Sequence, residues 1–173
     1  MFYVSDTIEK RHLMIRSFYN KDHVCIAVLL ASTDFEWTLR RAIVSLGIDP
    51  TADIRTVIKM YHKLIDYSNL WDKQVAKNNK IRNKKPWASV RLSVLISNWD
   101  FLTKEALPFR NQIIHGFNTS PGLDYARERC EAILYASKSI VDFSLSHGVD
   151  LYKRLPTRRR TKPQLKSINK KLR

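Results

Sequence analysis

Apolar positions recur every three or four residues over long stretches of this chain, which is the spacing of amphipathic α-helices. The longest such stretch covers residues 123–147 and stops before Gly148. A second long helix is predicted over residues 22–46, because its apolar run ends before Gly47, a residue type that suits the position after a helix end, and Pro50 follows. The predicted buried face of the 123–147 helix consists of Ala126, Cys130, Ile133, Ser137, Ile140 and Ser144, flanked by Leu134, Val141 and Leu145.

Two shorter helices are predicted on either side of the helix over 22–46. The first covers residues 6–19, where Asp6 and Glu9 fit an N-terminal capping arrangement. The second covers residues 51–67 and begins with capping residues. One face of the first helix carries Ile8, His12, Ile15 and Tyr19.

The middle of the chain has a less regular pattern. Residues 68–86 are polar, and from 73 to 85 they hold six basic residues and no acid, which predicts an exposed basic loop with room for a short helix. Residues 87–107 begin with a strand-like alternation, but a helical stripe matches a longer window and favours one helix. Pro108 then kinks this helix or opens a new one at its first turn. These patterns predict an all-α bundle of four to five helices whose short connections favour antiparallel neighbours.

The composition agrees with a single helical domain. Only four of the 173 residues are Gly, fewer than many tight β-turns need, and 44% hydrophobic residues suffice for one core. No apolar run approaches the ~18 residues of a membrane helix, and the N-terminal residues lack the continuous apolar segment of a signal peptide. We therefore expect a cytoplasmic protein with no membrane segment. Cys25 and Cys130 lie in helical patterns and are expected to be reduced core residues.

The charge of the chain is strongly positive and unevenly distributed. The net charge is +15, and residues 153–173 hold ten Lys and Arg without an acid, which leaves +5 for residues 1–152. We predict a helical domain over 1–152 and a basic, disordered tail over 153–173. Such charge attracts nucleic acid, an acidic protein or an anionic membrane surface. The residues predicted to bind RNA phosphates are Lys73, Lys77, Lys80, Arg82, Lys84 and Lys85 in the loop and Arg158, Arg159 and Arg160 in the tail.

Two tryptophans flank the basic loop. Trp71 and Trp87 can either stack on RNA bases or anchor the loop to the core. The pattern alone leaves both interpretations open.

Residues 109–116, FRNQIIHG, are best suited to chemistry. RNA can be cleaved without a metal when its own 2′-OH attacks the phosphorus, which requires a proton carrier active at neutral pH and fixed positive charge near the phosphorane oxygens. His115 suits the first task and Arg110 the second. Asn111 can orient the histidine or hold a phosphate oxygen. Because Arg110 and His115 are about 140° apart on an ideal helix, a symmetric dimer or a helix that ends near His115 is needed for them to converge.

This segment resembles the motif of the HEPN superfamily, in which an Arg and a following polar residue precede a His shortly before the last helix of an all-α bundle. The resemblance implies a metal-independent endoribonuclease without a cofactor, acting on RNA as a homodimer whose two motifs face one cleft. It also implies a role as a toxin or in phage defence, with an antitoxin or regulatory protein as a further partner. One subfamily of toxins carries Tyr two residues after the His; Phe117 stands there in this chain, which argues against that subfamily.

The bare Arg/His pattern occurs three times in the chain. Residues 16–23 and 55–62 also begin with Arg and end with His, with six residues between them. The match at 110–115 is preferred for its context, since Asn follows the arginine, two isoleucines precede the histidine and Gly follows it.

Glu36 is the second candidate for the site. It falls in the apolar stripe of Leu39 and Ile43, where a carboxylate costs stability unless it is paired. The resemblance implies an acidic residue of this helix facing the motif, so Glu36 would contact Arg110 or help to position the substrate. Asp34 is a weaker candidate for the same role. The alternative is that Glu36 lies at the edge of the stripe and reaches solvent.

Other chemistries have less support in the sequence. There is no Gly-rich phosphate loop, and His23 and Cys25 are too few for a zinc site, so no metal or cofactor is expected. Two alternatives for the motif stay open. His115 can be a helix C-terminal histidine beside Gly116, stabilised by the helix dipole. The whole chain can also be a non-catalytic, basic helical module that binds nucleic acid or a partner.

Overall fold

The computed structural model describes residues 7–46, 64–78, 80, 90–118 and 120–152. These residues form helices and turns with no β-strand, which confirms the predicted all-α class. The helix predicted over 51–67 lies mostly outside the described residues, and the predicted tail over 153–173 lies entirely outside them. The helices are α1 (Ile8–Arg16), α2 (Val24–Ser45), α4 (Leu64–Asn78), α5 (Leu92–Leu95), α6 (Trp99–Phe101), the π-helix η2 (Leu102–Ala106), α7 (Leu107–Ile114) and α8 (Leu123–Ser146).

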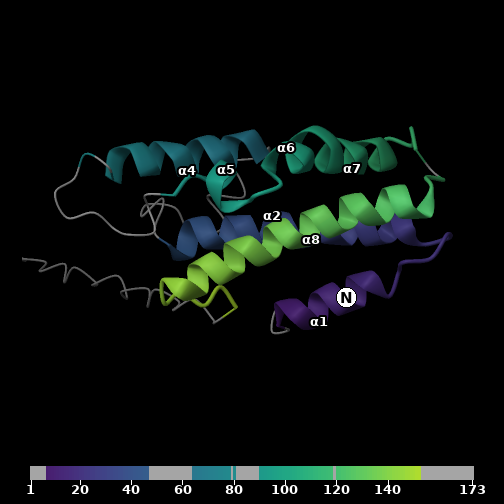
Figure 1. Cartoon of the computed structure of the whole chain (residues 1–173), viewed down its shortest axis with the longest axis horizontal. Helices are drawn as coiled ribbons and strands as arrows, with labels where there is room; N and C mark the ends of the chain where they lie inside the picture. Colours follow the sequence, from purple (N-terminus) through teal and green to yellow (C-terminus); the bar gives the residue numbers. More distant parts are fainter. Residues whose placement is uncertain (1–6, 47–63, 79, 81–89, 119, 153–173) are drawn as a thin grey trace, which may run out of the picture.

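The helices are arranged in three layers around α2 and α8 (Figure 1). α2 and α8 lie side by side in the middle, α4 to α7 form one layer on one side of them, and α1 covers the other side. The consecutive helices α1 and α2 are antiparallel, as are α7 and α8, which agrees with their short connections. α2 and α8, far apart in the sequence, run in the same direction.

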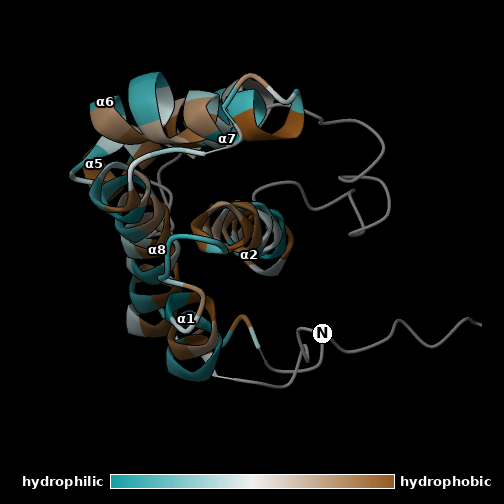
Figure 2. Ribbon diagram, turned by 90° about the vertical axis from the view of Figure 1, so that its right-hand side faces the viewer, coloured by the Kyte–Doolittle hydropathy of each residue, from teal (hydrophilic) through white to brown (hydrophobic). Residues whose placement is uncertain are grey.

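The two long helices were predicted within two residues at each end. All six residues of the predicted α8 face are buried, whereas the flanking Leu145 is exposed. α2 is central, with apolar residues on most of its circumference (Figure 2). No helix in the described part of the chain is long and apolar enough to cross a membrane.

α1 is shorter than the predicted helix over 6–19. Its N-cap is Thr7, whose Oγ1 accepts the Lys10 backbone N–H at 3.4 Å. Ile8, His12 and Ile15 are buried, as the apolar pattern predicts. Arg11 is buried on the same face, which links α1 to the polar cluster described below.

The prediction of a loop with room for a short helix over 68–86 underestimated the helix, because residues 68–78 all belong to α4, whereas the predicted exposure of Lys73, Lys77 and Lys80 is confirmed. Trp71 and Val75, four residues apart, are both buried and fasten this helix to the core. The Trp71 indole donates to the Val90 carbonyl at 2.8 Å and packs against Phe143. Trp71 is therefore an anchor and cannot stack on RNA bases, whereas Trp87 lies outside the described residues.

The prediction of one helix over 87–107 is wrong. α5 ends at Leu95, its C-cap Ile96 has an extended backbone (φ −100°, ψ 99°), and the chain becomes helical again at Trp99. The predicted stripe still faces inward, since Leu92, Ile96 and Leu102 are buried despite the break. Pro108 stands in the first turn of α7, as predicted.

Candidate functional site

The candidate motif lies on α7, at the outer end of the α4–α7 layer. Its first residue, Arg110, is half-buried, and its Nη1 donates to Oδ1 of the exposed Asn111 at 3.0 Å. The preceding Phe109 is almost fully buried and holds α7 in the core. The helix, held in place through Phe109, thus presents Arg110 and Asn111 at the protein surface.

His115 is the C-cap of α7 and is exposed. Gly116 follows with φ +73°, a conformation that favours glycine. The Gly116 N–H bonds the Ile113 carbonyl at 3.1 Å and the Phe117 N–H bonds the Gln112 carbonyl at 2.9 Å, which together form a Schellman motif. The helix therefore ends at the histidine, which is one of the two conditions expected to bring His115 toward Arg110.

Arg110 and His115 are nevertheless not joined within one chain. In the part that the structure describes, no hydrogen bond links the two side chains, and the imidazole lies near the ring of Phe117, with 6.2 Å between centroids. Two large apolar side chains beside the histidine face solvent, Ile114 at 50% exposure and Phe117 at 83%. An exposed apolar pair of this kind, next to charged and polar residues, is typical of a surface that meets a ligand or another protein.

Glu36 does not meet the motif in the single chain. Its carboxylate forms an ion pair with Arg40 one turn further along α2, and its side chain is 39% exposed. No ion pair joins Glu36 to Arg110 among the described residues. The expected Glu36–Arg110 contact is therefore not formed here, and the alternative of a glutamate at the stripe edge describes its surroundings better.

Asp34 is the buried acid of α2, although the sequence ranked it below Glu36. Its Oδ1 accepts the Nε–H of Arg11 on α1 at 2.6 Å, and both side chains are at most 4% exposed. Its Oδ2 lies 3.4 Å from Nε2 of the buried His12. Burial alone would lower the pKa of Arg11, but the charge and hydrogen bond of Asp34 raise it above the ordinary value.

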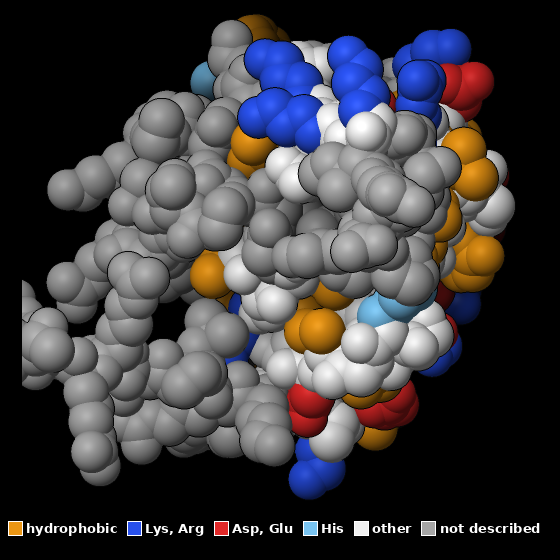
Figure 3. Space-filling model, turned by 90° about the vertical axis from the view of Figure 1, so that its left-hand side faces the viewer, with side chains coloured by type: hydrophobic (Ala, Val, Ile, Leu, Met, Phe, Trp, Pro, Cys, Tyr) orange, Lys and Arg blue, Asp and Glu red, His pale blue; other side chains and the backbone are white. Residues whose placement is uncertain are grey.

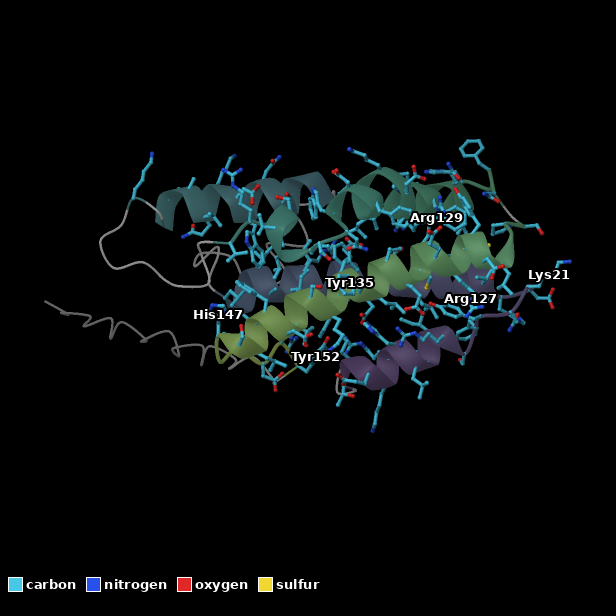
Figure 4. All side chains as sticks on the ribbon, in the orientation of Figure 1. Lys21, Arg127, Arg129, Tyr135, His147 and Tyr152 are labelled. Carbon is cyan, nitrogen blue, oxygen red and sulfur yellow. The ribbon has the colours of Figure 1, made fainter. Side chains whose placement is uncertain are left out.

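The chain segment after α8 completes this buried cluster. The Arg11 guanidinium lies 4.3 Å from the Tyr152 ring centroid and also bonds its hydroxyl. Tyr152 stacks on Trp37 of α2, with 5.6 Å between centroids, and Arg41 donates to the Leu151 carbonyl. Figure 4 places Tyr152 between the end of α8 and α1. Arg11, His12 and Asp34 are buried while Trp37 and Tyr152 are half-buried, so we interpret the cluster as a structural contact that joins α1, α2 and this segment.

The predicted RNA-binding residues are only partly described. Lys73, Lys77 and Lys80 are all exposed along α4 and its end. Figure 3 shows Lys and Arg side chains gathered at the top of one face, where the layer containing α4 lies. The remaining predicted residues, Arg82, Lys84, Lys85, Arg158, Arg159 and Arg160, lie outside the described residues.

The two cysteines and the acidic residues offer little other chemistry. Both thiols are free; Cys130 is buried and Cys25 half-buried. Burial raises the pKa of Cys130 to about 12, which disfavours the reactive thiolate. Within the described ranges, no group of three or more His, Cys, Asp or Glu side chains could hold a metal ion.

The sequence and the fold were compared with those of known proteins. No family model, no curated protein and no solved structure matches this chain.

Proposed function

We propose that this protein is a metal-independent endoribonuclease of the HEPN type, and that it acts as a homodimer. The observation that carries the proposal is the position of the motif. Arg110 is half-buried and Asn111 is exposed on α7, and the exposed His115 is the residue at which this helix stops. A toxin or phage-defence role follows from the same resemblance and belongs to the proposal.

The reaction uses only groups that this chain and RNA supply. His115 takes the proton from a ribose 2′-OH, O2′ forms a bond to phosphorus, and the P–O5′ bond breaks. A second His115, from the other protomer, gives a proton to the leaving O5′. Arg110 neutralises the phosphorane oxygens and Asn111 hydrogen-bonds one of them. The products are a 2′,3′-cyclic phosphate and a 5′-hydroxyl end.

The exposed residues around the motif support a composite site. Within one chain no hydrogen bond joins Arg110 to His115 among the described residues, and in the proposed dimer the arginine of one copy and the histidine of the other would meet at one phosphate. Ile114 and Phe117 supply exposed apolar surface for that contact. The acidic residue expected from α2 is Glu36. Its carboxylate is ion-paired with Arg40 in the single chain, so the proposed site depends on the motif residues.

The test is cleavage of total RNA by purified protein in excess EDTA. Wild type is expected to cleave, whereas Arg110→Ala and His115→Ala are expected to lose at least about a hundredfold in rate while retaining fold and dimer. Mapping the ends should give 2′,3′-cyclic phosphates. Equal cleavage by all three proteins would mean that the activity lies elsewhere or in a contaminant.

The chain offers a matched control for each variant. His147 is the C-cap of α8 and precedes Gly148, which has the same φ of +73° as Gly116. His147→Ala therefore makes the same chemical change at a second helix end, where the imidazole is half-buried against Phe143. Arg127, exposed and 3.9 Å from Asp124, is the control for Arg110. His147→Ala and Arg127→Ala are expected to cleave RNA at the wild-type rate.

The alternative function is a non-catalytic, basic helical module that binds nucleic acid or a protein partner. The observation that favours it is the row of exposed lysines on α4, which needs no catalytic residue. Under this alternative, wild type and both motif variants bind RNA in a salt-sensitive manner and none of them cleaves it.

A further inference from the structure

The helix that carries the motif is preceded by a break in α-helical register. Residues Leu102–Ala106 form a π-helix, and the Leu107 N–H bonds the carbonyl of Leu102, five residues back. A π-turn is less favourable than an α-turn and persists where surrounding contacts fix it, often beside functional sites. Each residue of an α-helix advances by about 100°, so the register of this segment determines where Arg110 and His115 point.

One side chain of α8 contacts the chain before, within and after the π-helix. The Arg129 guanidinium lies 5.4 Å from the ring centroid of Phe101 and 5.9 Å from that of Phe109. Its Nη2 donates to Oε2 of Glu105, inside the π-helix, at 3.1 Å. In Figure 4, Arg129 lies between α8 and the layer above it that contains α7.

The spacing of these three partners explains why the wider turn suits them. Phe101, Glu105 and Phe109 follow one another at intervals of four. On an ideal α-helix the first and last would point about 80° apart. The larger turn of the π-helix reduces this drift, so that all three meet the same guanidinium.

The Arg129 side chain is itself rigidly held. It is only 7% exposed, and its guanidinium lies 3.3 Å from the ring centroid of Tyr125. Tyr125 in turn packs edge-on against Phe109, with 5.3 Å between centroids. Phe109 directly precedes Arg110. The Arg129 guanidinium therefore contacts the motif segment through the buried Phe109 ring.

We propose that Arg129 and Glu105 are positioning residues that hold the π-helical register and thereby set the direction of Arg110 and His115. The catalytic part of this inference rests on the proposed ribonuclease function, whereas the structural part does not. Loss of the Arg129–Glu105 bond releases the π-helix and loosens α7, although neither residue belongs to the motif.

The test compares Glu105→Gln and Arg129→Lys with Glu128→Gln in the full-length protein. Glu105 is half-exposed, so its variant is expected to fold even if Arg129→Lys does not. Glu128 also forms an ion pair with Arg129, at 3.3 Å. Both residues of this pair lie on α8, so the pair does not join α8 to the π-helix. Glu128→Gln is therefore a matched control. Amide hydrogen exchange and chemical shifts over 102–115 are measured by NMR, with buried Ile133 of α8 as the internal reference for global unfolding.

Both test variants are expected to speed exchange of the Leu107 amide about tenfold relative to Ile133, and the control is expected to leave it unchanged. RNA cleavage should then fall about ten- to a hundredfold in kcat with little change in KM. Wild-type exchange and shifts over 102–115 in both test variants would overturn the positioning role. If α7 loosens as expected but wild type cleaves no RNA, the positioning role stands and the ribonuclease proposal fails.

Discussion

Arg11 of α1 and Asp34 of α2 form a buried ion pair, with Nε and Oδ1 2.6 Å apart. Removing Asp34 takes from the buried Arg11 guanidinium its carboxylate partner on α2, while the Tyr152 hydroxyl contact stays. We expect Asp34→Ala to lower the free energy of unfolding by about 3–5 kcal/mol, measured by urea denaturation. The double variant Arg11→Met/Asp34→Leu should lose less, because no charge is stranded. A double variant less stable than Asp34→Ala would contradict this account.

The second ion pair of α1 predicts a pH dependence. Arg16 bonds Glu131 through two contacts of 2.8 and 2.7 Å, and Tyr19 adds a third of 2.8 Å. The bond from Arg16 lowers the pKa of Glu131 although burial acts against it. A carboxyl whose folded pKa is lowered contributes stability above its unfolded pKa of about 4.3 and loses it as the pH falls through the folded value.

Wild type should therefore be more stable than Glu131→Gln by about 0.5–1 kcal/mol at pH 7, since the pair is half-exposed. This difference should shrink as the pH falls below about 4. Thermal or urea unfolding of both proteins at several pH values measures it. A difference that grows on acidification would show that the carboxylate does not stabilise the fold.

The two thiols should react very differently. Burial raises the pKa of both, that of Cys130 to about 12, and Cys130 is fully buried whereas Cys25 is half-buried. A thiol-specific disulfide reagent at pH 8 should therefore titrate one thiol in the folded protein and two in denaturant. Cys25→Ser should abolish the reaction of the folded protein. Reaction of a thiol in folded Cys25→Ser would instead mean that the α8 region opens readily.

The lysines of α4 predict a change in salt dependence. We expect Lys73→Gln, Lys77→Gln and Lys80→Gln together to reduce the slope of log K against log salt for poly(U) binding by about 2, since each phosphate contact on a single strand contributes about 0.7. Lys104→Gln and Lys138→Gln are controls, because Lys104 is ion-paired with Asp100 and Lys138 with Asp142, and should leave the slope nearly unchanged. An unchanged slope in the triple variant would exclude this row from the RNA contact.

The long helices could be predicted because their patterns are local and complete. The predicted face of α8 is buried as expected, and the stop before Gly148 follows from the glycine alone. The extent of α4 was missed because the polar residues of 68–86 and the basic residues of 73–85 outweighed the pairing of Trp71 and Val75, which stand one turn apart. The break at Ile96 was missed because the same apolar stripe continues across it.

The candidate site shows a different limit. The end of α7 at His115 could be predicted from Gly116. Which of the two acids Asp34 and Glu36 is buried could not be predicted. Two acids two residues apart on a helix point to different sides, and only the docking of α1 selects the one that is buried. In the sequence, a buried acid on α2 was indicated only by Arg11, which lies on the apolar face of Ile8 and Ile15 and needs an acidic partner there.

The contacts of Leu151 and Tyr152 bear on how far the chain can be shortened from its C-terminal side before the bundle loses stability. A chain cut after Gly148 would remove the carbonyl that accepts from Arg41 and the ring that covers Trp37, and Arg11 would lose its phenolic partner. A chain cut after Tyr152 retains all of these contacts. Fragments that end at these two points should therefore differ sharply in solubility and in resistance to proteases, although only four residues separate them.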